Sequence, residues 1–293
     1  MHKAGFVNIV GNPNVGKSTL MNQLVGEKLS IATFKAQTTR HRIMGIVNTE
    51  DSQIVFSDTP GVLKPNYKMQ EMMLQFSESA LADADILLYV TDVIEDPEKN
   101  MDFLEKVAKM SIPVILLINK IDESDQKKLG DLVTKWHGLL PNAEKLPISA
   151  KNKFGIDILM KRVHELLPES PAFFDKDQLT DKPAKFFVSE IIREKILRYY
   201  DKEIPYSVEV VVESFKEDDR QIHINAVIYV ERNSQKGIII GHQGMALKKV
   251  STEARKSLER FFDKKIFLET FVKVDKDWRN SQKELKHFGY NPE

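Results

Sequence analysis

Five short apolar runs alternate with longer stretches of helical character in the first half of this chain. The runs are Phe6–Val10, Ile54–Ser57, Ile86–Val90, Val114–Ile118 and Leu146–Ile148. Continuous apolar runs are typical of parallel strands that helices cover on both faces. The pattern predicts a doubly wound, mostly parallel α/β sheet. Because ligands of such sheets bind beyond the carboxyl ends of the strands, we expect the polar motifs that follow four of these runs to converge.

The first polar motif follows the first run directly. It reads Gly-Asn-Pro-Asn-Val-Gly-Lys-Ser and fits G-x-x-x-x-G-K-S between a strand and a helical stretch, a context that disfavours an ordinary glycine turn. In such a loop backbone N–H groups face phosphates, Lys17 supplies positive charge, and Ser18 offers a hydroxyl to magnesium. This is the phosphate loop of P-loop NTPases. The predicted phosphate-binding residues are Gly11, Asn12, Pro13, Asn14, Val15, Gly16, Lys17, Ser18 and Thr19.

Two further segments suit the phosphate end of a nucleotide. At Asp58-Thr59-Pro60-Gly61 a carboxylate can hold a magnesium-bound water and the Gly61 N–H can approach a γ-phosphate, although D-x-x-G alone also fits a plain turn. The polar segment 36–42 predicts a switch loop, with a solvated basic loop as the alternative. Thr39 is the expected magnesium ligand there, and Thr38 is the alternative. The predicted metal ligands are Ser18, Thr39 and Asp58.

The motif after the fourth run selects the base. In Asn119-Lys120-Ile121-Asp122 the carboxylate of Asp122 can accept hydrogen bonds from N1–H and the N2 amino group of guanine, and adenine has neither donor. An unpaired carboxylate costs enough free energy for roughly ten-thousandfold discrimination. The tripeptide Ser149-Ala150-Lys151, common in itself, follows the last run and is placed to complete the base pocket. The sequence therefore predicts binding of GTP and GDP over ATP.

The second half of the chain has a different organisation. Residues 168–183 contain three prolines and no clear period, and predict a linker. A helix is expected at 188–200, an antiparallel hairpin from strands 207–213 and 221–230, a basic helix at 245–262 and a strand at 266–274. The order α-β-β-α-α-β is that of the α+β type II KH domain. The expected domains are 1–168, a linker at 169–184, and 185–293.

A G-x-x-G tetrad lies between an apolar run and the basic helix of this second half. Such a tetrad is common by chance, but in a KH domain it joins two helices and lets a sugar-phosphate backbone come close. From Arg232 to Lys265 there are nine basic residues against three acidic ones, whereas the whole chain has 43 of each. A local basic face is typical of phosphate binding, with a solvated helix face or anionic lipid as alternatives. The predicted RNA-binding residues are Lys236, Ile239, Ile240, Gly241, His242, Gln243, Gly244, Lys248 and Lys249.

Composition excludes several other classes. The chain has no cysteine, which removes disulfides, thiolate zinc sites and cysteine nucleophiles, and fits a reducing cytosol. Its apolar runs are far below the roughly 18 residues of a membrane span, and no secretory leader is visible. We expect a cytoplasmic monomer, with weak peripheral contact at the inner face of the cell membrane left open.

Residues 5–165 resemble the translation-factor-like GTPases, with the expected motifs in the expected order. The whole chain resembles the bacterial Era family within that group, of the TrmE-Era-EngA type. The segments that carry the likeness are Lys35–Arg42, Leu179–Asp181, Ile191–Leu197 and Ile240–Gly244. The resemblance implies a GTPase that uses magnesium, binds the 3′ end of 16S ribosomal RNA, and assists assembly of the small (30S) ribosomal subunit and rRNA maturation. It also implies catalytic roles for Lys17, Asn14, Thr39 and Gly61.

One position departs from the Ras pattern. Val62 stands where Ras-like proteins carry the glutamine that orients the attacking water, so we expect slow intrinsic hydrolysis. The resemblance to GTPases with an apolar residue at this place implies help from a potassium ion, with Asn14 as its ligand. Two rivals remain at this point: a P-loop kinase, which has no use for Asn119–Asp122, and an RNA-binding protein whose nucleotide site is static.

Overall fold

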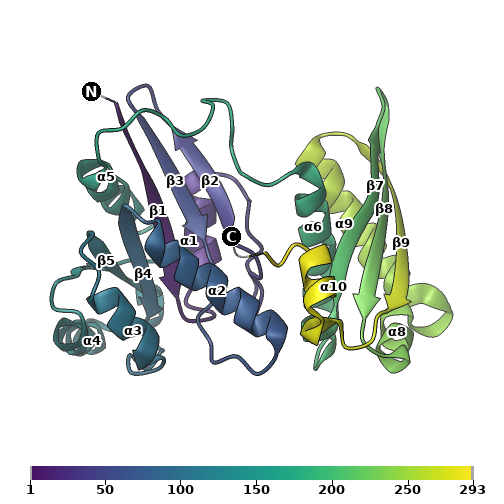
Figure 1. Cartoon of the computed structure of the whole chain (residues 1–293), viewed down its shortest axis with the longest axis horizontal. Coiled ribbons are helices and arrows are strands. Elements are labelled where there is room, and N and C mark those ends of the chain that lie inside the picture. Colours follow the sequence, from purple (N-terminus) through teal and green to yellow (C-terminus); the bar gives the residue numbers. More distant parts are fainter. Residues whose placement is uncertain (1, 292–293) are drawn as a thin grey trace. The chain divides into compact units, whose positions relative to one another are not determined.

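The computed structural model describes residues 2–291 of the 293. The described chain forms two compact units (Figure 1). The first contains the residues up to Asn66 together with Gln70–Asp181, and the second contains Tyr67–Met69 and Lys182–Asn291. Residues 169–181, which we expected to be linker, thus belong to the first unit.

The first unit is built on a six-stranded sheet with the order β2-β3-β1-β4-β5-β6. Five strands are parallel, as predicted, and β2 runs antiparallel to β3 at one edge. The strand β2 was not predicted, because its short sequence is interrupted by Gly45. The strands are β1 Lys3–Gly11, β2 Ile43–Asn48, β3 Ser52–Asp58, β4 Ile86–Asp92, β5 Val114–Asn119 and β6 Glu144–Pro147.

Helices cover both faces of this sheet. The apolar side chains of α2, α3 and α4 share one core cluster with β4 and β5, while α1 and α5 contact each other elsewhere in the unit. The helices are α1 Lys17–Val25, α2 Lys68–Ala82, α3 Met101–Ala108, the 3-10 turn η1 Ile121–Glu123, α4 Gln126–Leu139 and α5 Ile156–Leu166. Strand β3 lies on one side of β1, and the later strands β4, β5 and β6 follow on the other side. The strand order therefore reverses at β1, and the loop after β1 lies at this switch point, where ligands of such sheets bind.

The segment after α5 is fastened along the edge strand β2. The Ile46 N–H donates to the Leu179 carbonyl at 2.8 Å, and the Thr180 hydroxyl donates to the Met44 carbonyl at 2.6 Å. The Met44 N–H donates to a carboxylate oxygen of Asp181 at 2.9 Å. These bonds tie the chain leaving the first unit to the strand that follows the switch loop.

The second unit contains a three-stranded sheet with the order β7-β8-β9. β7 and β8 form the predicted antiparallel hairpin, and β9 lies parallel to β8. The predicted α-β-β-α-α-β order is confirmed, with the short helix α7 and the C-terminal elements η3 and α10 in addition. The elements are α6 Ala184–Tyr199, α7 Ile204–Ser207, β7 Glu209–Glu217, β8 Gln221–Val230, α8 Asn233–Ile240, η2 His242–Gly244, α9 Met245–Phe262, β9 Lys265–Val274, η3 Trp278–Asn280 and α10 Gln282–His287.

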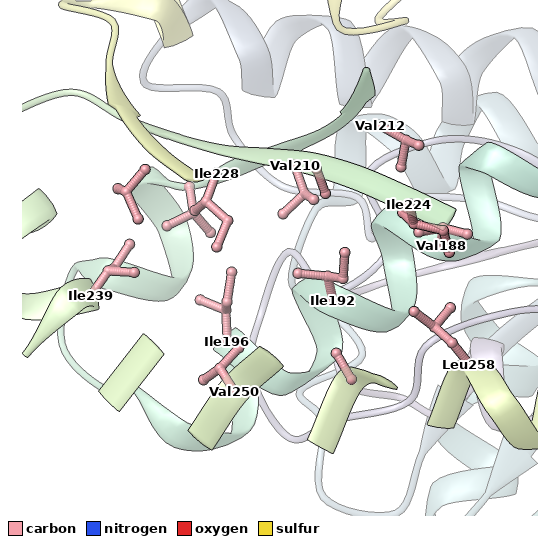
Figure 2. Close-up of a cluster of buried hydrophobic side chains, with 14 of the residues drawn as sticks. Val188, Ile192, Ile196, Val210, Val212, Ile224, Ile228, Ile239, Val250 and Leu258 are labelled. Atoms are coloured by element: carbon pink, nitrogen blue, oxygen red, sulfur yellow. The ribbon is translucent and has the colours of Figure 1, made fainter. Parts of the chain in front are cut away.

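The core of this unit lies between the sheet and its helices. Figure 2 shows aliphatic side chains of α6, such as Ile192 and Ile196, facing those of the β7–β8 hairpin, such as Val210 and Ile228. Side chains of α8 and α9 belong to the same cluster. Burial of these branched side chains fixes the two helices that flank residues 241–244.

Candidate functional site

The motifs after the strands meet at the carboxyl edge of the first sheet. The side-chain amide of Asn119, at the end of β5, donates to the Val15 carbonyl at 2.8 Å and accepts from the Ala150 N–H at 2.9 Å. The Lys120 ammonium donates to the Asn14 carbonyl at 2.7 Å. The residues expected to bind base and phosphates are thus bonded to each other.

Two glycines are required by close approach. A Cβ at Gly16, whose φ is +98°, would lie 2.3 Å from the Asn119 amide nitrogen. A Cβ at Gly61 would lie 2.7 Å from backbone atoms of Pro13. The phosphate loop is therefore held between the base motif on one side and the Asp58–Gly61 turn on the other.

Lys17 is buried at the centre of this loop. Its ammonium donates to the carbonyls of Gly11 and Asn12 at 3.0 and 2.9 Å. Burial lowers the pKa of Lys17 to about 8, while the charges of Asp58 and Glu95 oppose that shift. A phosphate group here would meet a desolvated positive charge, which interacts more strongly than one in water.

Three oxygens form a cluster suited to a hard cation. Ser18 Oγ lies 2.7 Å from Asp58 Oδ2 and 2.8 Å from Thr39 Oγ1. Burial raises the pKa of the Asp58 carboxyl, and among the described residues its Oδ1 finds no hydrogen-bond partner. A carboxylate with hydroxyls beside a phosphate site fits Mg²⁺. Thr38 instead bonds Thr33 Oγ1 and the Lys35 carbonyl, so the geometry favours Thr39.

At the base end, Asp122 and Ser149 are paired. Ser149 Oγ donates to Asp122 Oδ1 at 2.6 Å, and the Asn152 N–H donates to the same hydroxyl at 3.2 Å. These bonds orient the carboxylate expected to read guanine. Lys151, expected in the same pocket, has an exposed side chain.

A pocket of about 440 Å³ lies over the phosphate loop and the switch loop. Thr19, Gly61, Lys120 and the fully exposed Phe34 are among the residues that line it. Asp92 was missed by sequence reasoning although it ends β4 at the same edge of the sheet. It forms an ion pair with Lys120 at 2.5 Å, and the rule that located the other strand-end motifs could have found it.

In the second unit, Gly241–Gly244 joins α8 to α9 as expected. Both glycines have positive φ, 70° and 74°, but a Cβ at Gly241 would lie 2.6 Å from that of Ala246, whereas a Cβ at Gly244 would meet nothing within 4 Å. The surface beside the loop is basic. Its side chains are exposed or partly exposed, namely Lys236, His242, Gln243, Lys248 and Lys249.

The structure places one of the predicted RNA-binding side chains in the core. The Ile239 side chain is 0% exposed and belongs to the hydrophobic core, and the Ile239 carbonyl accepts a hydrogen bond from the Tyr200 hydroxyl at 2.7 Å. Ile240 is partly buried against the same core. Ile238 is 48% exposed and is the isoleucine of this run that a base could contact.

The fold and the two sites define a P-loop GTPase joined to a KH-type domain. The family described as "50S ribosome-binding GTPase" matches residues 6–120, and the family described as "KH domain" matches residues 203–279. The chain is 44% identical to GTPase Era of Clostridium kluyveri over 99% of this chain and 100% of that protein. It is 46% identical to GTPase Era of a Geobacter species, strain M21, over 98% of each chain. The chain belongs to the Era family of GTPases.

Two solved structures are similar over nearly the whole chain. The Era of Aquifex aeolicus, in a variant bound to GDP and AlF4⁻, has a TM-score of 0.94 and 37% identity, and the match covers 98% of this chain and 99% of that one. An Era in complex with MgGDPNP and nucleotides 1506–1542 of 16S ribosomal RNA also has a TM-score of 0.94 and 37% identity, over 99% of each chain. Within residues 2–291, no helix is both long and apolar enough to span a membrane.

Proposed function

We propose that this GTPase is a nucleotide-controlled switch that binds the 3′ region of 16S rRNA and assists 30S subunit assembly and rRNA maturation. The observation that carries the proposal is the internally bonded guanine nucleotide site in one unit together with an open glycine loop beside exposed lysines in the other. The similar Era solved with MgGDPNP and nucleotides 1506–1542 of 16S rRNA supports it.

At the phosphate end, we assign positioning and charge stabilisation to the protein and nucleophilic attack to water. Lys17 and the loop N–H groups bind the phosphates, and the Gly61 N–H approaches the γ-phosphate. Ser18, Thr39 and Asp58 would hold magnesium, which when bound neutralises charge between the phosphates. Thr39 belongs to the switch loop, so its place beside Ser18 would depend on the nucleotide state.

We also propose that a potassium ion assists hydrolysis, with Asn14 as a ligand. The Val62 side chain is 3% exposed in the core and offers nothing to an attacking water, whereas Asn14 is exposed and lines the nucleotide pocket. GTP turnover should be faster in potassium than in sodium, and Asn14→Asp should change that ratio. Equal turnover in the two salts would remove the potassium ion from the proposal.

The RNA end would work through close approach and charge. The open space at Gly244 leaves room for a sugar-phosphate backbone, exposed Ile238 can contact an unstacked base, and Lys248 and Lys249 can neutralise phosphates. We place this activity in the cytoplasm, with the small ribosomal subunit as partner of a monomeric protein. Anionic lipid at the inner membrane face is the competing occupant of the same basic surface.

The test is binding of a 16S 3′-end oligonucleotide in the presence of a GTP analogue, GDP or no nucleotide. We expect tightest binding with the GTP analogue, and loss of binding in Gly244→Asp with GTP hydrolysis retained. Vesicles containing anionic lipid form a second arm. Unchanged RNA affinity in Gly244→Asp, equal affinity in all nucleotide states, or binding to vesicles in preference to RNA would contradict the proposal.

A further inference from the structure

Helix α3 begins at a residue whose side chain does not cap it. Asn100 is the N-cap, a position where asparagine commonly accepts a hydrogen bond from the first helical turn, but it makes no such bond. Its backbone is left-handed, with φ 63° and ψ 47°. The side chain therefore has a use other than starting the helix.

That side chain joins the phosphate loop to the turn after Asp58. Asn100 Nδ2 donates to Asn12 Oδ1 at 2.6 Å and to the Val62 carbonyl at 3.1 Å. One acceptor belongs to the phosphate loop, and the other belongs to the residue that follows Gly61. A single amide group thus fixes two loops of the nucleotide site to each other.

The acceptor on the phosphate loop is itself oriented. The Asn12 side chain is 3% exposed and lies near the Glu95 carboxyl group, which accepts from Thr91 Oγ1 at 2.9 Å. Because Asn12 Oδ1 accepts from Asn100, the amino group of Asn12 is the end that is left to face the Glu95 carboxyl group. Hydrogen bonds therefore run from Asn12 of the phosphate loop through Asn100 to Val62.

The turn at Gly61–Val62, which Asn100 holds, has few other groups that could position the attacking water. The Val62 N–H donates to the Gly11 carbonyl at 3.1 Å, so hydrogen bonds restrain the backbone of this residue at both its N–H and its carbonyl. The Val62 side chain is buried and cannot orient an attacking water. The position of the Gly61 N–H then depends on the backbone, and Asn100 is a side chain that restrains it.

We propose that Asn100 is a positioning residue for GTP hydrolysis, setting where the Gly61–Val62 backbone stands relative to the phosphate loop. The inference rests on the hydrolytic role proposed above for this site. A displacement of about 1 Å at a reacting centre can cost roughly 100-fold in rate. Nucleotide affinity depends on other contacts, those of Lys17 and the base motif. Loss of the Asn100 amide should therefore lower kcat and leave GDP binding unchanged.

Two substitutions remove the amide without straining the backbone. Asn100→Gly tolerates the left-handed conformation, and glycine is among the residues favoured at an N-cap. Asn100→Asp keeps the shape and tolerates positive φ, but it has no N–H to donate. Lys99→Gly is the matched control, because it introduces the same flexibility at an exposed neighbour.

The experiment measures kcat, KM, GDP affinity and thermal midpoint for these proteins and for Asn12→Ala with and without Asn100→Gly. We expect kcat to fall about tenfold or more in both Asn100 variants, with GDP affinity and midpoint held, no change in Lys99→Gly, and non-additive effects in the double variant. Wild-type kcat in both Asn100 variants, or a joint fall of kcat, GDP affinity and midpoint, would overturn the proposal. An inactive wild-type protein would contradict the hydrolytic role itself.

Discussion

The nucleotide site and the glycine loop of the second unit differ in how much of their geometry exists before a ligand arrives. In the first unit, the Asn119 side chain donates a hydrogen bond to the phosphate loop, and the Ser18 hydroxyl donates one to Asp58. In the loop at Gly241–Gly244, the side chains of His242 and Gln243 are exposed. The first site is organised by its own side chains, and the second by the helices on either side of it.

Gly16 and Gly244 show this difference most directly. At Gly16 the space for a Cβ is taken by the protein, 2.3 Å away, whereas at Gly244 that space is open. A site made of paired groups rejects a wrong ligand because the mismatch leaves groups unpaired. An open loop beside lysines binds mainly through phosphate charge and close approach. We therefore expect the first unit to discriminate strictly between nucleotides, and we expect the affinity of the second unit for RNA to be mainly electrostatic.

The largest effect should come from Asp122→Asn. The amide keeps an oxygen that can accept from N1–H but loses the acceptor for the guanine N2 amino group, and its own N–H can pair with the C2 carbonyl of xanthine. GTP affinity should fall about a thousandfold and preference should pass to xanthosine triphosphate. Nucleotide competition assays measure this.

RNA affinity without nucleotide serves as the control for that substitution and should not change. Ser149 Oγ can still donate to the amide oxygen at residue 122, so the pocket should keep its shape. An Asp122→Asn protein that still prefers GTP over xanthosine triphosphate would show that this carboxylate does not read the base.

The same substitution made in both regions sharpens the comparison. Gly16→Ala places a methyl group against the Asn119 amide and should lower nucleotide affinity about 100-fold, because the loop must move. Gly244→Ala meets only a backbone penalty of roughly 1–2 kcal/mol and the approaching ligand, so RNA affinity should fall about tenfold. Each variant should keep the other activity, as measured by nucleotide titration and RNA titration.

Sequence reasoning placed residues that belong to contiguous motifs, and it misplaced or missed residues whose position depends on tertiary packing. The phosphate loop could be placed because strand, glycines and helix are contiguous, and the convergence with Asn119 followed from strand order. Three consecutive isoleucines, 238–240, carry no period, so only the packed core reveals that Ile239 is inside. Thr39 was named ahead of the adjacent and chemically identical Thr38, and in the fold the Thr39 hydroxyl donates to Asp58. Asn100 lies in no motif.

A smaller effect should appear in the pH dependence of nucleotide binding. With a pKa lowered to about 8, Lys17 of the free protein loses its proton as the pH rises through 8, whereas bound phosphates favour the ammonium form. Binding therefore takes up a proton above that pH, and GDP affinity should fall about tenfold between pH 7 and pH 9. Calorimetry in buffers of different ionisation enthalpy measures the proton uptake.

Lys17→Arg is the control for that pH dependence, because guanidinium stays charged throughout this range. We expect the GDP affinity of Lys17→Arg to be lower than that of the wild-type protein but to vary less with pH. A wild-type curve parallel to that of Lys17→Arg would assign the dependence to the nucleotide or to another group.

The smallest effect should come from single lysines of the second unit. Lys248 is exposed, whereas the Lys249 ammonium lies 4.5 Å from the centroid of the Tyr199 ring and is held by it. Lys248→Gln should weaken RNA binding only a few-fold and reduce the slope of log affinity against log salt by about 1, with GTP hydrolysis unchanged. Lys249→Gln should lose slightly more, because a held ammonium is already placed for a phosphate. Titrations at several salt concentrations measure both slopes, and a loss that salt does not modulate would mean that these lysines act through packing and that the second unit is as pre-organised as the first.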